Sequence, residues 1–378
     1  MSVWLTDEQQ LIKDSAERLV QNDYTIEARQ KLIESEEGFS RDNWATFAEL
    51  GWLGLPFKEE HGGFGGTAVD MAVLMEALGK GLVVEPFASS VILAGTALDI
   101  GGGPLAEALL PEMIAGERLL AFAHSEPKSR FNLSDVTVTA DAEGDGFKIN
   151  GQKMLVYHGG SADSLIVSAR TSGTQRDRDG ITLFVVDRTA EGVTVRGHRT
   201  VDGLRAAEIT LTDVKVGADA ILGLQDKGFE IVEDVIDRAC VQFAAEACGA
   251  MEKAVELTVD YTKERKQFGR PLSSFQALQH KMADMYSAHQ FARALTYRAA
   301  ALLDDCDPAE RAEAAAAVKV KCGNSSKLVG EEAIQLHGGM GMTADMPIGH
   351  YFKRLTMINA LFGNAQYHLK RYAAMKAE

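Results

Sequence analysis

The middle of the chain limits the fold most strongly. Between about Leu119 and Gly223, short runs rich in Val, Ile, Leu and Thr follow one another, separated by polar turns. They include VTVTA, FKINGQKML, LIVSAR, ITLFVV, VTVRGH and ITLTDVKV. Short strands without helices between them predict an antiparallel barrel or sandwich and argue against a doubly wound sheet. The pair Asp145-Gly146 predicts the turn of a hairpin inside this region.

Helical patterns flank the middle region on both sides. Near the start, Thr6 and Gln9 have the spacing of a capping box, and apolar residues recur behind them at helical spacing. After the middle region, long helical patterns cover Phe229–Arg265, Ser274–Asp304 and Pro308–Leu336, and a last helix is expected from about Ala365. Long helices joined by short loops predict a four-helix bundle. The expected architecture is an N-terminal α-helical domain (1–118), a middle antiparallel β-barrel or sandwich (119–223) and a C-terminal four-helix bundle (224–378).

The glycine-rich run Gly62–Gly66 has two interpretations. A phosphate-binding loop requires a buried strand before it and a Gly-Lys-Ser/Thr ending after it, and this run has neither. We therefore interpret it as a turn between helices.

Composition excludes several classes of protein. The formal net charge is −15, and no cluster of Lys and Arg is present, so a nucleic-acid partner is not expected. No apolar window is long enough to span a bilayer, and the N-terminus lacks the pattern of a signal peptide. The four cysteines lack CxxC spacing, which predicts buried thiols in a reducing compartment rather than a metal site. A cytoplasmic protein is expected.

Two segments near the C-terminus give the chain a family resemblance. ERKQFGRPLSSFQALQHKMADM (Glu264–Met285) and QLHGGMGMTADMPIGHYFKR (Gln335–Arg354) resemble the acyl-CoA dehydrogenase family. ELGWLGLPFKEEHGGFGGT and DVKVGADAILG resemble it in the same order. The resemblance implies an FAD enzyme with its cofactor in a cleft between the β-domain and the C-terminal bundle. It also implies an acyl-CoA substrate, a carboxylate that removes the α-proton, hydride transfer to flavin N5, and an electron-transfer protein as acceptor.

The resemblance also assigns cofactor residues, one position at a time. Arg265 matches an arginine that reaches the FAD pyrophosphate of a neighbouring subunit, a task suited to a planar, permanently charged guanidinium. The remaining cofactor positions implied by the family are Ser125, Leu155, Val156, Tyr157, Phe268, Gln276, Gln335, Leu336, Gly338, Gly339, Asn364 and Gln366. Because such a cofactor site is shared between chains, a dimer or tetramer is expected, as a homo- or hetero-oligomer.

The catalytic base is where the chain departs from the family. Phe362 occupies the position at which most members carry a catalytic glutamate, and a phenyl ring accepts no proton. The alternative base position, on the preceding long helix, is Ala239. Asp237 is a weak candidate nearby, and we interpret it as an exposed, solvated charge. Glu246, two turns further along, is expected to be a buried structural acid.

The β-domain departs as well. Ser125, Glu126 and Pro127 fit the family pattern, but Lys128–Leu133 replace a glycine-rich flavin loop. Leu155 and Tyr157 stand where a tryptophan and a threonine usually face the flavin, and GLRAAEITLTDV is about three residues short. Tyr157 is open to two interpretations, a flavin contact or an ordinary tyrosine on an edge strand.

Four functions remain open at this point. One is a dehydrogenase subunit without its own base that works beside a base-carrying partner, because the chain resembles the small subunits of pimeloyl-CoA-type dehydrogenases. The second is desulfinase-like chemistry on an acyl-CoA. The third is a non-catalytic subunit that completes a partner's FAD site, and the fourth is a conventional dehydrogenase that uses Asp237 or another base.

Overall fold

The computed structural model describes residues 5–377, which form two compact units. The first unit contains residues 5–31, Thr67–Val83 and the chain from Cys240 onward; the second contains Leu32–Gly66 and Val84–Ala239. These divisions follow packing and differ from the domain boundaries expected at 118/119 and 223/224, which stay a prediction.

The middle region forms one eight-stranded sheet, in the order β6-β7-β3-β2-β4-β5-β8, with β1 paired to β4. Its strands are β1 (Leu120–Ala123), β2 (Thr139–Glu143), β3 (Gly146–Tyr157), β4 (Ser164–Arg170), β5 (Ile181–Asp187), β6 (Val193–Arg199), β7 (Arg205–Gly217) and β8 (Ile221–Leu222). Most pairs are antiparallel, but β4 pairs in parallel with β1 and β2. Alternate residues of these strands enclose a core of Val, Ile, Leu, Ala and Phe. The expected β-domain is confirmed.

The predicted position of the turn between β2 and β3 was wrong by one residue. Glu143 pairs with Gly146, so the two loop residues are Gly144 and Asp145, not Asp145 and Gly146. Gly144 has a φ of 62°, the left-handed backbone that a two-residue hairpin loop requires and that glycine adopts without strain.

The first third of the chain is helical, as expected. Its elements are α1 (Asp7–Asp23), α2 (Ile26–Glu34), α3 (Arg41–Glu49), η1 (Trp52–Gly54), η2 (Glu59–His61), α4 (Ala68–Gly81), the π-helix η3 (Ala88–Gly95), α5 (Thr96–Gly101) and α6 (Gly103–Ile114). Thr6 and Gln9 form the predicted capping box. The glycine-rich run is a turn between η2 and α4, as predicted. A Cβ at Gly63 would lie 2.1 Å from the carbonyl oxygen of Phe57, so this glycine serves packing against the chain's own backbone.

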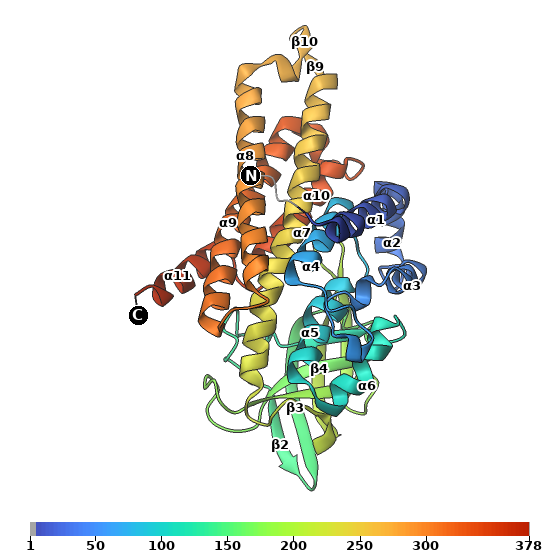
Figure 1. Cartoon of the computed structure of the whole chain (residues 1–378), viewed down its shortest axis with the longest axis vertical. Helices are drawn as coiled ribbons and strands as arrows, with labels where there is room; N and C mark the ends of the chain where they lie inside the picture. Colours follow the sequence, from blue (N-terminus) through green and yellow to red (C-terminus); the bar gives the residue numbers. More distant parts are fainter. Residues whose placement is uncertain (1–4, 378) are drawn as a thin grey trace. The chain divides into compact units, whose positions relative to one another are not determined.

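Five long or medium helices follow the sheet. They are α7 (Gly228–Glu264), α8 (Gln276–Leu302), α9 (Pro308–His337), α10 (Pro347–Ala360) and α11 (Ala365–Met375), with short elements β9 (Lys266–Gln267), β10 (Arg270–Pro271), η5 (Leu272–Ser274) and η6 (Gly338–Met342) between them. The β9–β10 hairpin closes the far end of the α7–α8 pair (Figure 1). α9 packs against α8, α10 and α11. The helical C-terminal region is confirmed, although the sequence patterns did not reveal α10, which begins inside the glycine- and methionine-rich motif.

None of the helices within residues 5–377 combines the length and the apolar character needed to cross a membrane.

Candidate functional site

Phe362, which the family resemblance places at the position of the catalytic glutamate, lies in a tight corner between two helices. α10 ends at Ala360, Phe362 has a φ of 56°, Gly363 has a φ of 110°, and α11 begins at Ala365. The ring of Phe362 contacts the ring of Phe243 on α7, with centroids 5.6 Å apart. Two aromatic rings therefore meet at the position where the resemblance implies a carboxylate, and neither ring can accept a proton.

The nearby acid on α7 is committed to a buried ion pair. Arg354 of α10 donates from Nε to Oε1 of Glu246 at 2.6 Å and from a terminal nitrogen to Oε2 at 2.7 Å. Both side chains are buried, and the guanidinium also lies 5.7 Å from the Phe243 ring centroid. The bidentate contact gives both carboxylate oxygens of Glu246 a charged hydrogen-bond partner. The expectation that Glu246 is a buried structural acid is confirmed.

Asp237 is not the solvated charge that we expected. Its exposed fraction is 0%, as is that of Ala239, the alternative base position. The expectation was wrong because Asp237 lies on a buried side of α7, whereas Asp234 and Arg238 on the same stretch are partly exposed. Burial makes an acid a better candidate for chemistry than a surface charge.

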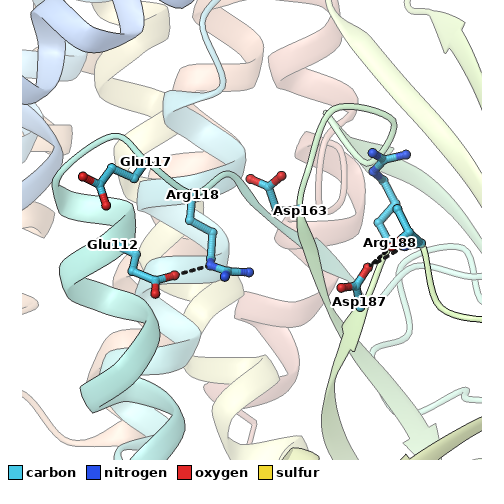
Figure 2. Close-up of a pocket in the computed structure, with 7 residues that line it drawn as sticks. Glu112, Glu117, Arg118, Asp163, Asp187 and Arg188 are labelled. Atoms are coloured by element: carbon cyan, nitrogen blue, oxygen red, sulfur yellow. Dashed lines mark hydrogen bonds and ion pairs between the residues drawn. The ribbon is translucent and has the colours of Figure 1, made fainter.

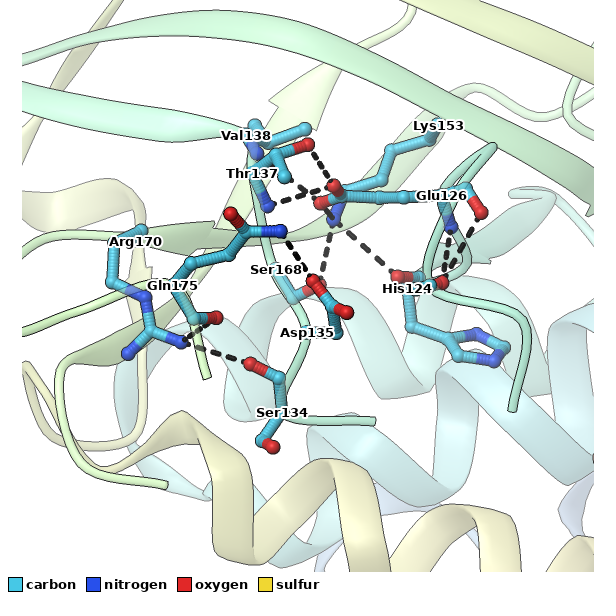
Figure 3. Close-up of polar contacts among 11 residues, drawn as sticks. His124, Glu126, Ser134, Asp135, Thr137, Val138, Lys153, Ser168, Arg170 and Gln175 are labelled. Carbon is cyan, nitrogen blue, oxygen red and sulfur yellow. Dashed lines mark hydrogen bonds and ion pairs between the residues drawn. The ribbon is translucent and has the colours of Figure 1, made fainter. Parts of the chain in front are cut away.

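In the second unit, an ion pair anchors the segment that carries Ser125. Lys153 on β3 donates from Nζ to Oε1 of Glu126 at 2.7 Å, and both side chains are fully buried (Figure 3). Glu126 also accepts from the backbone N–H groups of Thr137 (2.8 Å) and Val138 (3.2 Å). Burial works to raise the pKa of Glu126, but Lys153 and these donors together hold it below its ordinary value. The carboxylate therefore stays charged and fixes the Ser125–Pro127 segment on the sheet.

The two flavin segments expected in the β-domain are neighbours. The Met154 N–H donates to the Ser125 carbonyl at 2.9 Å, which places Ser125 beside the Leu155–Tyr157 stretch. The pairing register of β3 shifts between Lys153 and Val156, and Leu155 has a φ of 52°. This β-bulge changes the direction of the side chains that follow, a feature frequent beside active sites. The sequence carried no signal for it, because no glycine marks the bulge.

Tyr157 does not lie on an edge strand. In the sheet order β3 lies between β7 and β2, Tyr157 itself pairs with Ala206 of β7, and its side chain is buried. The interpretation of Tyr157 as an ordinary tyrosine on an edge strand is therefore wrong. Its contact with the flavin stays a prediction.

The loop that replaces the family's glycine-rich segment is held by arginine and aspartate. Arg170 donates to the carbonyl oxygens of Ser134 and Gln175, each at 3.0 Å (Figure 3). It also donates to the carbonyl oxygen of Asp177 at 3.0 Å. Gln175 in turn donates to Asp135 at 2.6 Å. Hydrogen bonds from Arg170 and Gln175 thus fix the residues that directly follow the Lys128–Leu133 segment.

The cofactor residues expected in the C-terminal region lie near the ends of its helices. The β9–β10 hairpin carries Phe268 and lies between Arg265 and Gln276 in the chain. The passage from α9 into η6 carries Gln335, Leu336, Gly338 and Gly339. Asn364 caps α11 by accepting from the Tyr367 N–H at 2.9 Å, and Gln366 is exposed on its first turn. Leu336 is buried, whereas the other cofactor positions expected in this region are exposed.

The exposed members of this group fit a pyrophosphate. Arg265 is exposed and forms no ion pair within residues 5–377, so its guanidinium is available to an anion. A Cβ placed on Gly338 or Gly339 would meet no atom within 4 Å, so a ligand can approach their backbone closely. Phe268 is 91% exposed, an unusual position for a large apolar side chain unless a ligand or another chain covers it.

The described part of the second unit includes two polar hollows that bear on the predicted site. One, of about 470 Å³, is lined by Glu112, Glu117, Arg118, Asp163, Asp187, Arg188 and Thr189. In Figure 2, Arg118 pairs with Glu112, and Asp187 accepts from the backbone N–H of Thr189 on its own loop. The other, of about 710 Å³, includes Gly160 and Ser161, which follow the Tyr157 segment. None of the predicted cofactor residues lines either hollow.

The fold and these side chains define an FAD-dependent oxidoreductase of the kind that acts on acyl thioesters, and comparisons with known proteins agree. The acyl-CoA dehydrogenase N-terminal, middle and C-terminal domain models match residues 6–117, 121–214 and 226–376. The chain belongs to the acyl-CoA dehydrogenase family, whose members bind FAD.

Individual relatives cover nearly the whole chain. It is 31% identical, over 91% of both chains, to the short-chain specific acyl-CoA dehydrogenase of Clostridium acetobutylicum. Among solved structures, it is similar to the ChsE4-ChsE5 complex from Mycobacterium tuberculosis, with a TM-score of 0.90 and 26% identity over 100% of this chain and 99% of that one. It is also similar to the Tcur3481-Tcur3483 steroid ACAD, with a TM-score of 0.88 and 29% identity over 98% of each chain.

Proposed function

We propose that this chain is a subunit of an acyl-CoA dehydrogenase that lacks its own catalytic base and works with a base-carrying partner chain. The observation that carries the proposal is the pairing of Phe362 with Phe243. It leaves an aromatic contact at the usual base position, while the acid nearby on α7, Glu246, is held by Arg354. With Ala239 at the other base position, neither known location offers a carboxylate.

The proposed role divides between cofactor binding and catalysis. Arg265 holds the pyrophosphate of FAD, the backbone at Gly338 and Gly339 lies against the cofactor, and Ser125, Leu155 and Tyr157 border the flavin. Bound FAD supplies a hydride acceptor for the β-hydrogen of the acyl chain. Removal of the α-proton falls to a carboxylate of the partner, and an electron-transfer protein reoxidises the assembly.

Two structural relatives support a two-chain assembly. Both the ChsE4-ChsE5 complex and the Tcur3481-Tcur3483 steroid ACAD carry the names of two proteins. We extend this arrangement to the present chain as part of the proposal, because Arg265 and Phe268 are exposed and available to another subunit.

The test compares the chain alone with the chain co-expressed with each dehydrogenase encoded beside it. Turnover is followed by reduction of an artificial electron acceptor with a panel of acyl-CoA thioesters. We expect the lone chain to show little or no turnover and the co-expressed pair to be active. Robust turnover by the lone chain on ordinary acyl-CoAs would reject the proposal.

The burial of Asp237 favours a second candidate, a conventional dehydrogenase that uses this residue as its base. Asp237→Asn distinguishes the two. If the lone chain is active and this substitution abolishes its turnover while its flavin content is retained, the second candidate holds.

A further inference from the structure

One buried cation faces the corner that carries Phe362. Lys319, on α9, is 3% exposed, and its Nζ donates to the carbonyl oxygens of Leu361 (2.6 Å), Ile358 (2.7 Å) and Asn359 (3.3 Å). Within residues 5–377, no carboxylate lies within ion-pair distance of it. The ammonium is thus satisfied by backbone carbonyls alone.

Those carbonyls belong to the C-terminal end of α10 and the residue beyond it. The last carbonyls of a helix have no partner within the helix, and they carry the negative end of its dipole. A cation there satisfies them and stabilises the helix end. Burying an ammonium is costly, and burial lowers the pKa of Lys319. The three hydrogen bonds to the carbonyls of Ile358, Asn359 and Leu361 offset this cost of burying the ammonium.

A second side chain holds the other half of the corner. The ring of His368, on α11, lies with Nε2 3.0 Å from the carbonyl oxygen of Phe362. Burial lowers the pKa of His368 to about 3, so the ring is neutral and Nε2 is the nitrogen that carries the donated proton. A Cβ at Gly363 would lie 2.4 Å from the Tyr367 ring and 2.8 Å from this Nε2, so only glycine fits beside the contact.

Phe362 itself pays a conformational cost in this corner. A non-glycine residue in the left-handed region is less stable by about 1–2 kcal/mol, and it persists only where the surroundings enforce it. Here the enforcing contacts act on the carbonyls of Leu361 and Phe362. Neither of these two contacts involves the side chain at position 362.

We propose that Lys319 is a positioning residue, which holds the Leu361–Gly363 corner so that the side chain at position 362 points in one fixed direction whatever its identity. The inference deepens the proposed function, on which it rests only for taking position 362 as the family's base position.

The test places a fluorine reporter on the corner. 4-Fluorophenylalanine is incorporated at position 362 or, as a control on the same helix–corner segment, at Phe352, and ¹⁹F spectra of the intact, flavin-loaded protein are recorded. Lys319→Met removes the donors and keeps the side-chain length. We expect the single resonance at position 362 to shift or split in this variant, because its ring leaves the Phe243 ring, while the resonance at Phe352 is unchanged.

Lys327→Met is the matched control, since Lys327 is an exposed lysine of the same helix. It should leave both resonances in place. Lys319→Gln, which keeps an N–H donor, should restore part of the native resonance; it also decides the question if Lys319→Met does not fold. An unchanged resonance at 362, or equal changes at 362 and 352, would overturn the proposal. Because the ¹⁹F readout does not depend on turnover, the proposal for Lys319 can fail while the proposed function holds, and the reverse.

Discussion

Glu85 is a buried acid with only half of its carboxylate satisfied. Its Oε1 accepts from the side-chain amide of Asn43 at 2.9 Å and from the Ser40 N–H at 3.4 Å, near the start of α3. Its Oε2 is buried and has no hydrogen-bond partner among residues 5–377. Burial raises the pKa of Glu85 from 4.5 to about 7. The residue directly precedes the turn into the π-helix η3, and such helices are frequent at functional sites.

Glu85→Gln should remove a pH dependence of stability. A carboxyl whose folded pKa is raised binds its proton more tightly in the folded state, so its contribution is fully present below pH 4.5 and is lost as pH rises through 7. A shift of this size corresponds to about 3 kcal/mol. Denaturant unfolding at pH 5 and pH 8 should show the wild type losing up to that much more stability than the variant. Parallel pH profiles for the two proteins would contradict this assignment.

Phe362→Glu tests whether the base is the only catalytic group that is missing. The corner geometry does not depend on the side chain at 362, so the new carboxylate should replace the ring. A positioned base typically contributes about 10²–10⁴-fold to rate, and we expect a gain of at least about 10²-fold in the lone, flavin-loaded chain. Phe362→Gln is the control, because glutamine has a size and polarity similar to those of glutamate but no basic group. Equal rates for the two variants would show that more than the base has been lost.

At the scale of elements, two glycines set how closely α4 and α7 approach. A Cβ at Gly249 would lie 1.8 Å from the carbonyl oxygen of Glu76, and one at Gly79 would lie 2.0 Å from that of Glu246. Each glycine therefore faces the backbone of the other helix, and neither neighbour can move without a shift of the helix. The same stretch of α7 carries Phe243 and Glu246, so this contact also places the residues beside Phe362.

Gly249→Ala should consequently destabilise the protein although alanine favours helices. Overpacking typically costs about 1–3 kcal/mol, and backbone-to-backbone contact places this site at the upper end of that range. Gly349→Ala, inside α10, is the matched control: its new Cβ would come no closer than 3.4 Å to another atom, so helix propensity should make it neutral or stabilising. Thermal unfolding of both variants measures the difference. Equal melting temperatures would show that the helices separate more easily than the close contact implies.

At the scale of the whole molecule, FAD retention should depend on Arg265, which forms no ion pair with an acid within residues 5–377. Arg265→Ala removes the guanidinium proposed for the pyrophosphate, and charge-assisted hydrogen bonds of this type contribute about 1.5–3 kcal/mol each. We expect flavin occupancy, measured by absorbance after gel filtration, to fall about tenfold or more. Arg298→Ala, at an exposed arginine of α8, should retain the wild-type flavin content. Equal flavin loss in both variants would remove Arg265 from the cofactor site.

Local residue patterns determined much of the architecture. Alternation and turn residues located β4, β5, β6 and β7, capping residues located the start of α1, and helical spacing located α7, α8 and α9. These features depend on residues near one another in the chain, so a single sequence contains them. The family motifs further determined the FAD chemistry and the absence of a base at position 362.

Contacts between distant residues were decided only by the tertiary structure. The burial of Asp237, the Glu246–Arg354 pair and the bulge at Leu155 each depend on which segments pack together, which no local pattern records. The same holds for Lys319: its sequence context is an ordinary alanine-rich helix, and its role appears only because its ammonium meets carbonyls about 40 residues further along the chain. The sequence determined that Phe362 cannot be a base, and only the tertiary structure decided which buried side chains, Lys319 and His368, bond to the carbonyls of the corner that holds it.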